Sequence, residues 1–496
     1  IYCVAVGLCL YWFNKGSSKK YYLIAFLIKS IFIFLITYSS LKDLSFLKVP
    51  DEDNYFHDAI LFHHLAIKYP IEYLRFWLDT EPDDKTIFNE FFTSTDAWNK
   101  APEFFYNDNR WVVKVHSLLS FLSGGYLSVH RLFSAMMFFV GLWWLVKYSL
   151  QIIQFYFDKI QISDTKRGQI FLIASLFPSV FFFTSFVLKE SILFLLLGSI
   201  LALSCEWFIL KNKSLFKLFI VIVLMIISIL FRPAYSLPFI YFITLYFLFE
   251  TYFQRFQRFR KWAYVLIALG ILILFSKVFQ LFSHKSFVEL VQYRQERFLD
   301  ASRGGIFLVN TKKFVRVPYD WNNLKFDSSH KNPVYYIKND VPIMYWRLEN
   351  LKDTIIEKNQ DTTESFHLLY YIEKANKTYY ISPINSKQSF LKNMNIVLQA
   401  ISIFFFYPEK IKSIMDIIVW IENILILVIL FFCINYFFSS SRISVYMGFV
   451  ILYAIFLIII ISLSAPNTGA IIRYRSFLYP FLFINIASIL LVKKNT

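Results

Sequence analysis

Charged residues are scarce in this chain of 496 residues, at 17% of the total, whereas hydrophobic residues make up 57%. A soluble domain carries about 25% charged residues, so the composition excludes an ordinary soluble protein. No repeat with a period of about 20 to 50 residues recurs, which argues against a solenoid. The few cysteines all lie in apolar segments and predict no disulfide framework: Cys3, Cys9, Cys205 and Cys433.

Aromatic residues and positive charge are abundant, at 21% of the chain and a formal net charge of +17. Aromatic side chains suit lipid-facing helices and interfacial belts. Lysine and arginine collect in the short cytoplasmic loops of membrane proteins, so the charge favours a polytopic membrane protein over a nucleic-acid-binding surface. We therefore expect membrane lipids as partners and no nucleic acid.

Apolar runs of about 17 to 25 residues predict membrane-spanning helices. We expect an all-α polytopic membrane protein with about eleven transmembrane helices. The first run is short and lacks an initiator methionine, so we do not interpret it as a signal peptide, and the chain is expected to begin inside a longer reading frame. The runs lie near residues 1–13, 22–41, 128–150, 169–186, 187–208, 215–231, 235–253, 263–282, 414–438, 445–465 and 473–492.

Basic residues fall in alternate short connections, which the positive-inside rule places in the cytoplasm. The remaining connections then share the extracytoplasmic face, and they include both large loops. The expected organisation is N-terminal helices over 1–41, a first extracytoplasmic loop over 42–127, a helical core over 128–282, a second extracytoplasmic loop over 283–413 and C-terminal helices over 414–496.

The two large loops differ in pattern. The first is rich in aromatic residues and predicts amphipathic helices along the membrane interface, one of them a half-buried helix over 111–127 that ends at Gly124-Gly125. In the second loop, short alternating runs after Gly304-Gly305 are separated by turn residues. These runs predict a small β-containing subdomain of roughly 80 residues.

Four carboxylates occur within the eight residues Asp51 to Asp58, just after the apolar run 22–41. Carboxylates near hydrocarbon are costly to maintain, which makes them candidates for function. The predicted topology places four cations on the same face, at the ends of separate spans: Lys189, Arg232, Arg473 and Arg475.

This combination is suited to a phosphate or diphosphate held at the membrane surface. Arginine binds phosphate in a bidentate manner, and lysine acts as a point charge. A facing carboxylate can act as a general base on an acceptor hydroxyl while the cations stabilise the departing phosphate. The pattern therefore predicts group transfer from a lipid-linked phosphate donor.

Each of these residues also has a structural interpretation. An arginine at the end of a span is often an interfacial anchor, although Arg473 and Arg475 lie on the face where few cations are expected. Lys189 beside Glu190 fits a structural ion pair equally well. A hard divalent cation such as Mg²⁺ or Mn²⁺ is a candidate cofactor, and its ligands would be Asp51, Glu52 and Asp53. We favour it over a transition-metal site built from the nearby histidines.

The order of motifs resembles a known superfamily. A carboxylate-rich motif followed by Tyr55, then an interfacial helix, then Leu127-Ser-Val-His-Arg-Leu-Phe-Ser-Ala, is similar to the membrane-embedded C-type glycosyltransferases, which include protein O-mannosyltransferases and lipid A aminoarabinose transferases. The segments that begin at Leu176, Ala301 and Pro466 look like bacterial members with envelope-polysaccharide functions. The resemblance covers about residues 22 to 492.

The resemblance implies transfer of a sugar from a polyprenyl-phosphate or polyprenyl-diphosphate donor to a glycan, lipid or protein acceptor, on the outer face of a bacterial cytoplasmic membrane. It also implies a catalytic acidic residue in the first loop. That residue would be Asp51, which lies four residues before Tyr55, with Asp53 as the next choice and Glu52 as a supporting or metal-binding group. The family's usual motif has two carboxylates, whereas this chain has three in a row.

The same resemblance assigns the remaining site residues. Lys189, Arg232, Arg473 and Arg475 would contact the donor phosphate. The substrate pocket would include Tyr55, Arg303, Gly304 and Gly305. Two alternatives stay open: a polysaccharide polymerase, which would join many repeats instead of adding one sugar, and a non-catalytic membrane subunit of a larger envelope complex.

Overall fold

The protein is described by a computed structural model. The residues that it describes are 18–41, 49–98, 107–157, 162–252, 261–271, 288–289, 291–292, 295, 383–385, 387–406, 414–439, 443–465 and 468–493, together with the strand backbone of 305–310, 313–317, 325–327, 334–338, 344–345, 354–358 and 363–373.

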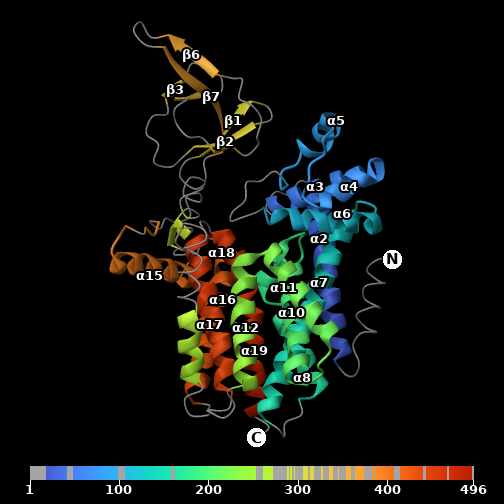
Figure 1. The fold of residues 1–496 in the computed structure, drawn as a ribbon, viewed down its shortest axis with the longest axis vertical. Coiled ribbons are helices and arrows are strands. Elements are labelled where there is room, and N and C mark those ends of the chain that lie inside the picture. Colours follow the sequence, from blue (N-terminus) through green and yellow to red (C-terminus); the bar gives the residue numbers. More distant parts are fainter. Residues whose placement is uncertain are drawn as a thin grey trace.

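Seven segments of the described chain are helical, long and apolar enough to cross a membrane. The protein is therefore an α-helical, multi-pass membrane protein, and these helices form one bundle (Figure 1). The segments are α2 (Lys19–Leu41), α7 (Leu127–Tyr156), α10 (Lys189–Phe208), α12 (Pro233–Tyr252), α16 (Ile414–Ser439), α17 (Ser444–Ser464) and the pair α18 (Thr468–Arg475) and α19 (Leu478–Lys493).

Shorter apolar helices occupy three further segments, α11 (Leu215–Phe231), Lys261–Ile271 and α15 (Phe390–Phe406). The expected span 1–13 and the second half of the span 263–282 lie outside the described residues. The total of about eleven crossings stays a prediction.

The expected single helix over 169–186 is wrong. The chain there forms two short helices, α8 (Asp164–Ser175) and α9 (Pro178–Phe183). Pro178 disfavours the helical conformation of the residue before it, and Phe177 has φ −54° and ψ 125°. The two helices are therefore separate. Together they still lead from one end of the bundle, where α8 begins, to the other end, where α10 starts (Figure 1).

The chain is interrupted again between α9 and α10, and a buried lysine stabilises this second break in the helix. Lys29 lies on α2 with no exposed surface, and its Nζ donates hydrogen bonds to Thr184 Oγ1 at 2.6 Å and to the carbonyl of Phe181 at 3.1 Å. The ammonium also lies 4.6 Å from the ring centre of Phe138. Lys29 therefore satisfies a backbone carbonyl near the C-terminus of α9.

Two glycines allow α7 and α10 to pack backbone against backbone. A Cβ atom added at Gly141 would lie 2.2 Å from the backbone of Phe194, and one added at Gly198 would lie 2.3 Å from the carbonyl oxygen of Gly141. Small residues permit such close approach between membrane helices, where van der Waals packing drives association. This contact holds the middle of α10 against the middle of α7.

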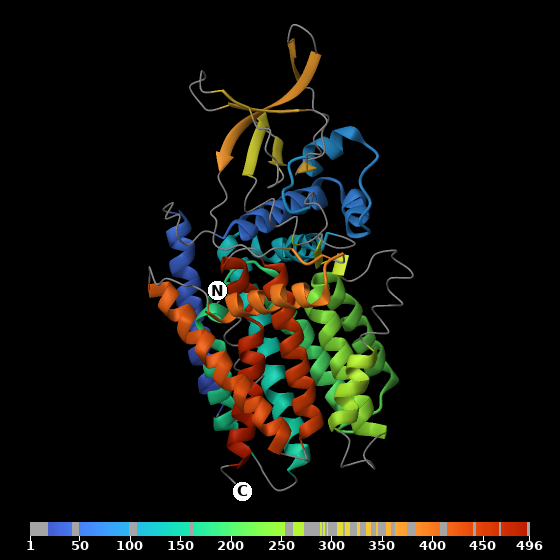
Figure 2. The ribbon, with the colours of Figure 1, turned by 90° about the vertical axis from the view of Figure 1, so that its left-hand side faces the viewer.

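The first large loop forms a layer of helices across one end of the bundle, here called the site end (Figures 1 and 2). Aromatic side chains make its core: the ring of Phe62 lies 4.1 Å from that of Phe76 and 5.0 Å from that of Trp98. The layer contains α3 (Pro50–Lys68), α4 (Pro70–Trp77), α5 (Lys85–Ile87), the π-helix η2 (Phe88–Phe92) and α6 (Asn109–Ser123).

The C-terminus of α6 lies where the sequence predicted it. Gly124 follows the last helical residue with φ +61°, the left-handed conformation that glycine adopts most readily. Apolar side chains on the outer faces of α4 and α6 are exposed, as in helices at a membrane interface: Ile71, Leu74, Leu118 and Leu122.

Part of the second large loop forms an antiparallel sheet in the order β3-β4-β7-β1-β2-β5, with β6 also paired to β7. Figure 2 shows the sheet beyond the helices of the first loop. A separate subdomain stays a prediction. The strands are β1 (Gly305–Asn310), β2 (Lys313–Val317), β3 (Lys325–Asp327), β4 (Val334–Lys338), β5 (Met344–Tyr345), β6 (Thr354–Lys358) and β7 (Thr363–Glu373).

The close contact between α7 and α10 makes a stability prediction. Gly141→Ala should lower the stability of the purified protein by about 1 to 3 kcal/mol, because the new methyl group meets backbone that has no rotamer to change. Thermal unfolding in detergent measures this. Gly270→Ala is the control, since a Cβ there meets nothing within 4 Å, and it should unfold at the wild-type temperature or above. An equal loss in both variants would contradict the packing argument.

Candidate functional site

The acidic run lies in the first turn of α3. Pro50 is at the helix start, where its missing N–H costs nothing, and carboxylates near a helix N-terminus are favoured by the helix dipole. Because successive helical residues are rotated by about 100°, three adjacent carboxylates point in different directions. Asp51 is 34% exposed in its side chain, Glu52 is buried and Asp53 is exposed.

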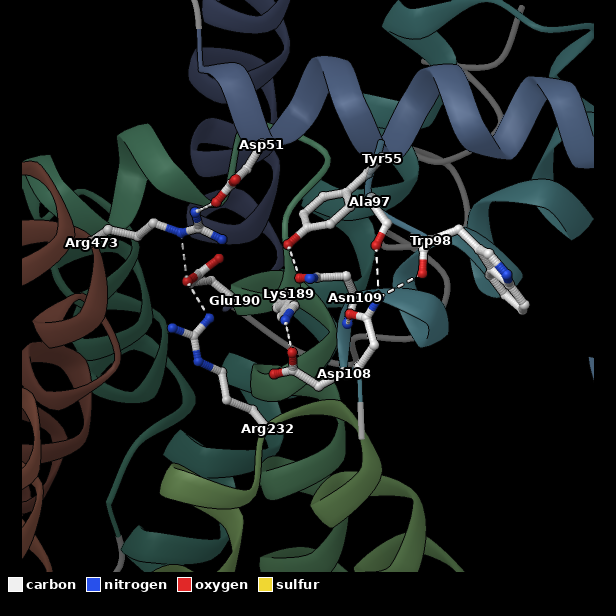
Figure 3. A network of polar contacts seen from close by, with 11 residues as sticks. Asp51, Tyr55, Ala97, Trp98, Asp108, Asn109, Lys189, Glu190, Arg232 and Arg473 are labelled. Carbon is white, nitrogen blue, oxygen red and sulfur yellow. Dashed lines mark hydrogen bonds and ion pairs between the residues drawn. The ribbon is translucent and has the colours of Figure 1, made fainter. Parts of the chain in front are cut away.

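A buried carboxylate, Glu190, is the centre of the site (Figure 3). Its Oε1 accepts hydrogen bonds from Arg473 Nε at 2.9 Å and from Arg232 Nη1 at 3.0 Å. Arg473 also donates through Nη1 to Asp51 Oδ2 at 2.5 Å. The network thus joins α3, α10, α18 and the residue between α11 and α12, which are far apart in the sequence.

A second pair of contacts lies beside this network. Lys189 Nζ contacts Asp108 Oδ1 at 2.6 Å, and the hydroxyl of Tyr55 donates to Asn109 Oδ1 at 2.7 Å. Burial raises the pKa of Tyr55, and the charge of Asp51 raises it further, so its hydroxyl stays a hydrogen-bond donor. Figure 3 shows Tyr55 between the Asp51 and Asn109 ends of the cluster.

The charges of the cluster balance within the described part of the chain. Burial alone would lower the pKa of Arg232, but the carboxylate of Glu190 raises it above its ordinary value, so the guanidinium is charged. Its carbon also lies 4.4 Å from the ring centre of Tyr474. Three cations face three carboxylates through ion pairs: Arg473, Arg232 and Lys189 with Asp51, Glu190 and Asp108.

Glu52 has a structural role that differs from its predicted catalytic or metal-binding one. Both of its oxygens accept from Arg131, at 2.9 and 2.5 Å, and its Oε1 also accepts the backbone N–H of Val187 at 2.9 Å. Arg131 donates in addition to Thr37 at 2.8 Å. The buried pair of Glu52 and Arg131 therefore ties α3 to α7, α2 and the segment before α10. It positions the elements that carry the site, but it is not part of the cluster around Glu190.

A second chain of hydrogen bonds positions Asn109 through Asn107, whose Oδ1 accepts the backbone N–H of Asn109 at 3.1 Å. The buried carboxylate of Asp58 accepts the backbone N–H groups of residues 96, 97 and 98 at 2.8 to 3.0 Å. Burial raises the pKa of Asp58, and these hydrogen bonds oppose the rise. The carbonyls of Ala97 and Trp98 then accept from the side-chain amide of Asn107, at 2.9 and 2.7 Å.

Arg475 is not at the site, contrary to the expectation that it binds donor phosphate with Arg473. Two positions along a helix correspond to a rotation of about 200°, so the two side chains leave α18 on opposite sides. Arg475 is 1% exposed; its Nη1 donates to the carbonyl of Phe404 at 3.2 Å and to Asn423 Oδ1. It thus anchors α15 and α16 against α18.

The predicted metal ligands are not brought together. Asp51 binds Arg473, Glu52 binds Arg131 and Asp53 is exposed. Within the described ranges, no group of three or more His, Cys, Asp or Glu side chains is placed to hold a metal ion. The shared Mg²⁺ or Mn²⁺ site expected for these three carboxylates does not fit this geometry.

The remaining predicted pocket residues are placed only in part. Arg303 and Gly304 lie outside the described residues, and Gly305 opens β1, where it pairs with Val317. Three residues of the cluster were absent from the predicted site, namely Glu190, Asp108 and Asn109. The sequence offers Lys189 as an ion-pair partner of Glu190, whereas in the structure Glu190 binds Arg473 and Arg232.

The chain matches no protein-family model, no curated protein and no solved structure. The resemblance to C-type glycosyltransferases therefore stays a prediction from the sequence.

The buried ion pair of Glu52 and Arg131 gives a stability prediction, in which the loss of a buried charge is compared with the loss of an exposed one. Glu52→Gln should lower stability by about 3 kcal/mol, because it leaves the buried guanidinium of Arg131 without a counter-charge. Asp53→Asn removes one charge from the adjacent residue, which is exposed, and should unfold within about 0.5 kcal/mol of wild type. Chemical denaturation in detergent compares them, and equal stabilities would refute the role assigned to Glu52.

Proposed function

We propose that this protein is an integral-membrane glycosyltransferase that moves a sugar from a polyprenyl-phosphate or polyprenyl-diphosphate donor to an acceptor hydroxyl at the site end of the bundle. The observation that carries the proposal is the convergence of Asp51 with Lys189, Arg232 and Arg473. Their positions in the sequence differ by up to 422 residues. We propose a bacterial cytoplasmic membrane as the location, with the site facing the exterior.

The chemistry assigned to these residues is a displacement at the anomeric carbon of the sugar. The acceptor oxygen forms a bond to that carbon, the bond from the carbon to the phosphate oxygen breaks, and its electron pair leaves with the phosphate. Asp51 takes the proton of the acceptor hydroxyl. Arg473, Arg232 and Lys189 stabilise the charge that develops on the leaving phosphate.

The surroundings of the cluster support a substrate that is partly lipid. The cluster lies where membrane-crossing helices meet the layer formed by α3 and α6 (Figures 1 and 3). A polyprenyl chain can remain in the bilayer while its phosphate reaches the side chains at the bundle end. The exposed apolar faces of α4 and α6 are consistent with this layer resting on lipid.

A second function is favoured by one feature of the same cluster. Every cation in it already has a carboxylate partner, as in a purely structural ion-pair network. A non-catalytic membrane subunit would need no more than this. The glycosyltransferase needs a general base and the non-catalytic subunit does not, so a test for that base distinguishes the two functions.

The transfer reaction is tested with purified protein in liposomes, labelled polyprenyl-phosphate and polyprenyl-diphosphate sugars, and a bacterial envelope extract as the source of acceptors. Wild type should release unglycosylated polyprenyl phosphate or diphosphate. Asp51→Asn should slow this release at least about a hundredfold, the usual contribution of a general base. Asp53→Asn should retain it, because Asp53 is exposed and lies outside the cluster.

The outcomes separate the candidate functions. Unchanged release by Asp51→Asn would reject Asp51 as the base, and slow release by Asp53→Asn alone would move the role to that residue. A product containing many repeats would identify a polymerase instead of a single-sugar transferase. No release by wild type from any donor would favour the non-catalytic subunit.

A further inference from the structure

The two carboxylates that bind Arg473 differ in how firmly the structure holds them. Glu190 is 4% exposed in its side chain and accepts from two arginines through one oxygen. Asp51 is 34% exposed and lies in the first turn of α3, at the edge of the cluster. Asp51 is therefore the most exposed of the three carboxylates in the cluster.

The charge balance limits how an anion can enter. Among the residues that the structure describes, three cations and three carboxylates of the cluster give no net charge, and the cations are 6 to 10% exposed in their side chains. A phosphate added to this arrangement would meet Asp51 and Glu190 at close range, and like charges in a poorly solvated site repel strongly. Binding becomes favourable when one carboxylate gives up its arginine.

We propose that Asp51 occupies the phosphate position in the free protein, and that a phosphate group displaces it from Arg473 Nη1. This inference rests on the proposed function and deepens it, because it makes Asp51 both the competitor of the donor phosphate and the base. The exchange breaks one charge-assisted hydrogen bond and forms another on the same guanidinium nitrogen. No covalent bond changes in this step.

The other carboxylates are poor candidates for the exchange. Releasing Glu190 would leave a buried charge unpaired and would also remove the counter-charge of Arg232. Asp108 is less exposed than Asp51, at 16%, and it pairs with Lys189 on the Tyr55 side of the cluster in Figure 3. Its release would therefore not free Arg473. Lys189 and Arg232 then remain charged and in place while Asp51 moves.

The exchange predicts an order of events. The exchange assigns the proton to Asp51 Oδ2, the oxygen that accepts from the guanidinium while Arg473 holds Asp51. Arrival of the phosphate frees that oxygen at the moment when a leaving group is present. The acceptor hydroxyl is therefore deprotonated only in the complex that contains the donor.

Binding measurements on the full-length protein in detergent test the exchange. The probes are inorganic phosphate, farnesyl phosphate and farnesol, and dissociation constants are compared for wild type, Asp51→Asn and Asp53→Asn. Asp51→Asn should bind farnesyl phosphate about tenfold more tightly than wild type, the equivalent of about 1.4 kcal/mol, because the competitor is gone. Asp53→Asn changes the net charge equally and should bind as wild type does.

The arms of this experiment distinguish the sources of the phosphate. Tighter binding of farnesyl phosphate but not of inorganic phosphate identifies a lipid phosphate as the ligand, and tighter binding of both identifies the phosphate group alone. Farnesol should bind equally to all three proteins, and Arg473→Ala should lose the phosphate-dependent part. Equal affinities of wild type and Asp51→Asn for both phosphates, or an equal gain in Asp53→Asn, would overturn the exchange.

Two controls keep the exchange separable from folding and from glycosyl transfer. Each variant is first checked by thermal unfolding, and Asp51→Ala replaces Asp51→Asn if the latter does not fold. Tighter phosphate binding by the Asp51 variant without any sugar transfer by wild type would support the exchange and reject the proposed function. Transfer by wild type with unchanged binding in the variant would do the reverse.

Discussion

The site depends on the neutralisation of one buried carboxylate. Glu190 lies in the first turn of a membrane helix and is 4% exposed, so its charge is tolerated only with cations in direct contact. Arg232 and Arg473 supply them from either side, which brings the α11–α12 connection and α18 to the start of α10. Arg473 has a further donor and uses it for Asp51, which places the N-terminus of α3 on the same cluster.

This arrangement requires that α10 begin in the right place, and several polar contacts around the break after α9 ensure that it does. Lys29 satisfies the carbonyl of Phe181, and Glu52 accepts the N–H of Val187 while it pairs with Arg131. Unpaired backbone groups at membrane depth would be costly, so the break exists only where such partners are present. A break stabilised by side chains from α2 and α3 therefore positions the charges that follow it.

Seven of the predicted spans coincide with described helices that are long and apolar enough to cross a membrane, and the sequence pattern placed Asp51, Arg232 and Arg473 at one end of the bundle. Helix geometry alone could have corrected two assignments: adjacent carboxylates diverge by about 100°, and residues two apart by about 200°. The pairing of Asp108 with Lys189 could not be predicted, because it depends on how the loop before α6 packs on α10. The choice of Arg131 as the partner of Glu52 is likewise a tertiary contact, 79 residues apart.

The balance of charges in the cluster also affects how the phosphate product would leave. In the proposed reaction a phosphodiester donor carries one negative charge, and the phosphate monoester that remains carries about 1.5 to 2 at neutral pH. The cations of the cluster would therefore hold the product more strongly than the substrate unless a competing anion were close. Asp51 is that anion once it has passed its proton to solvent, which its 34% exposure allows. The carboxylate that yields to the donor would then return to Arg473 and displace the product, so that a site with balanced charges favours turnover over tight binding.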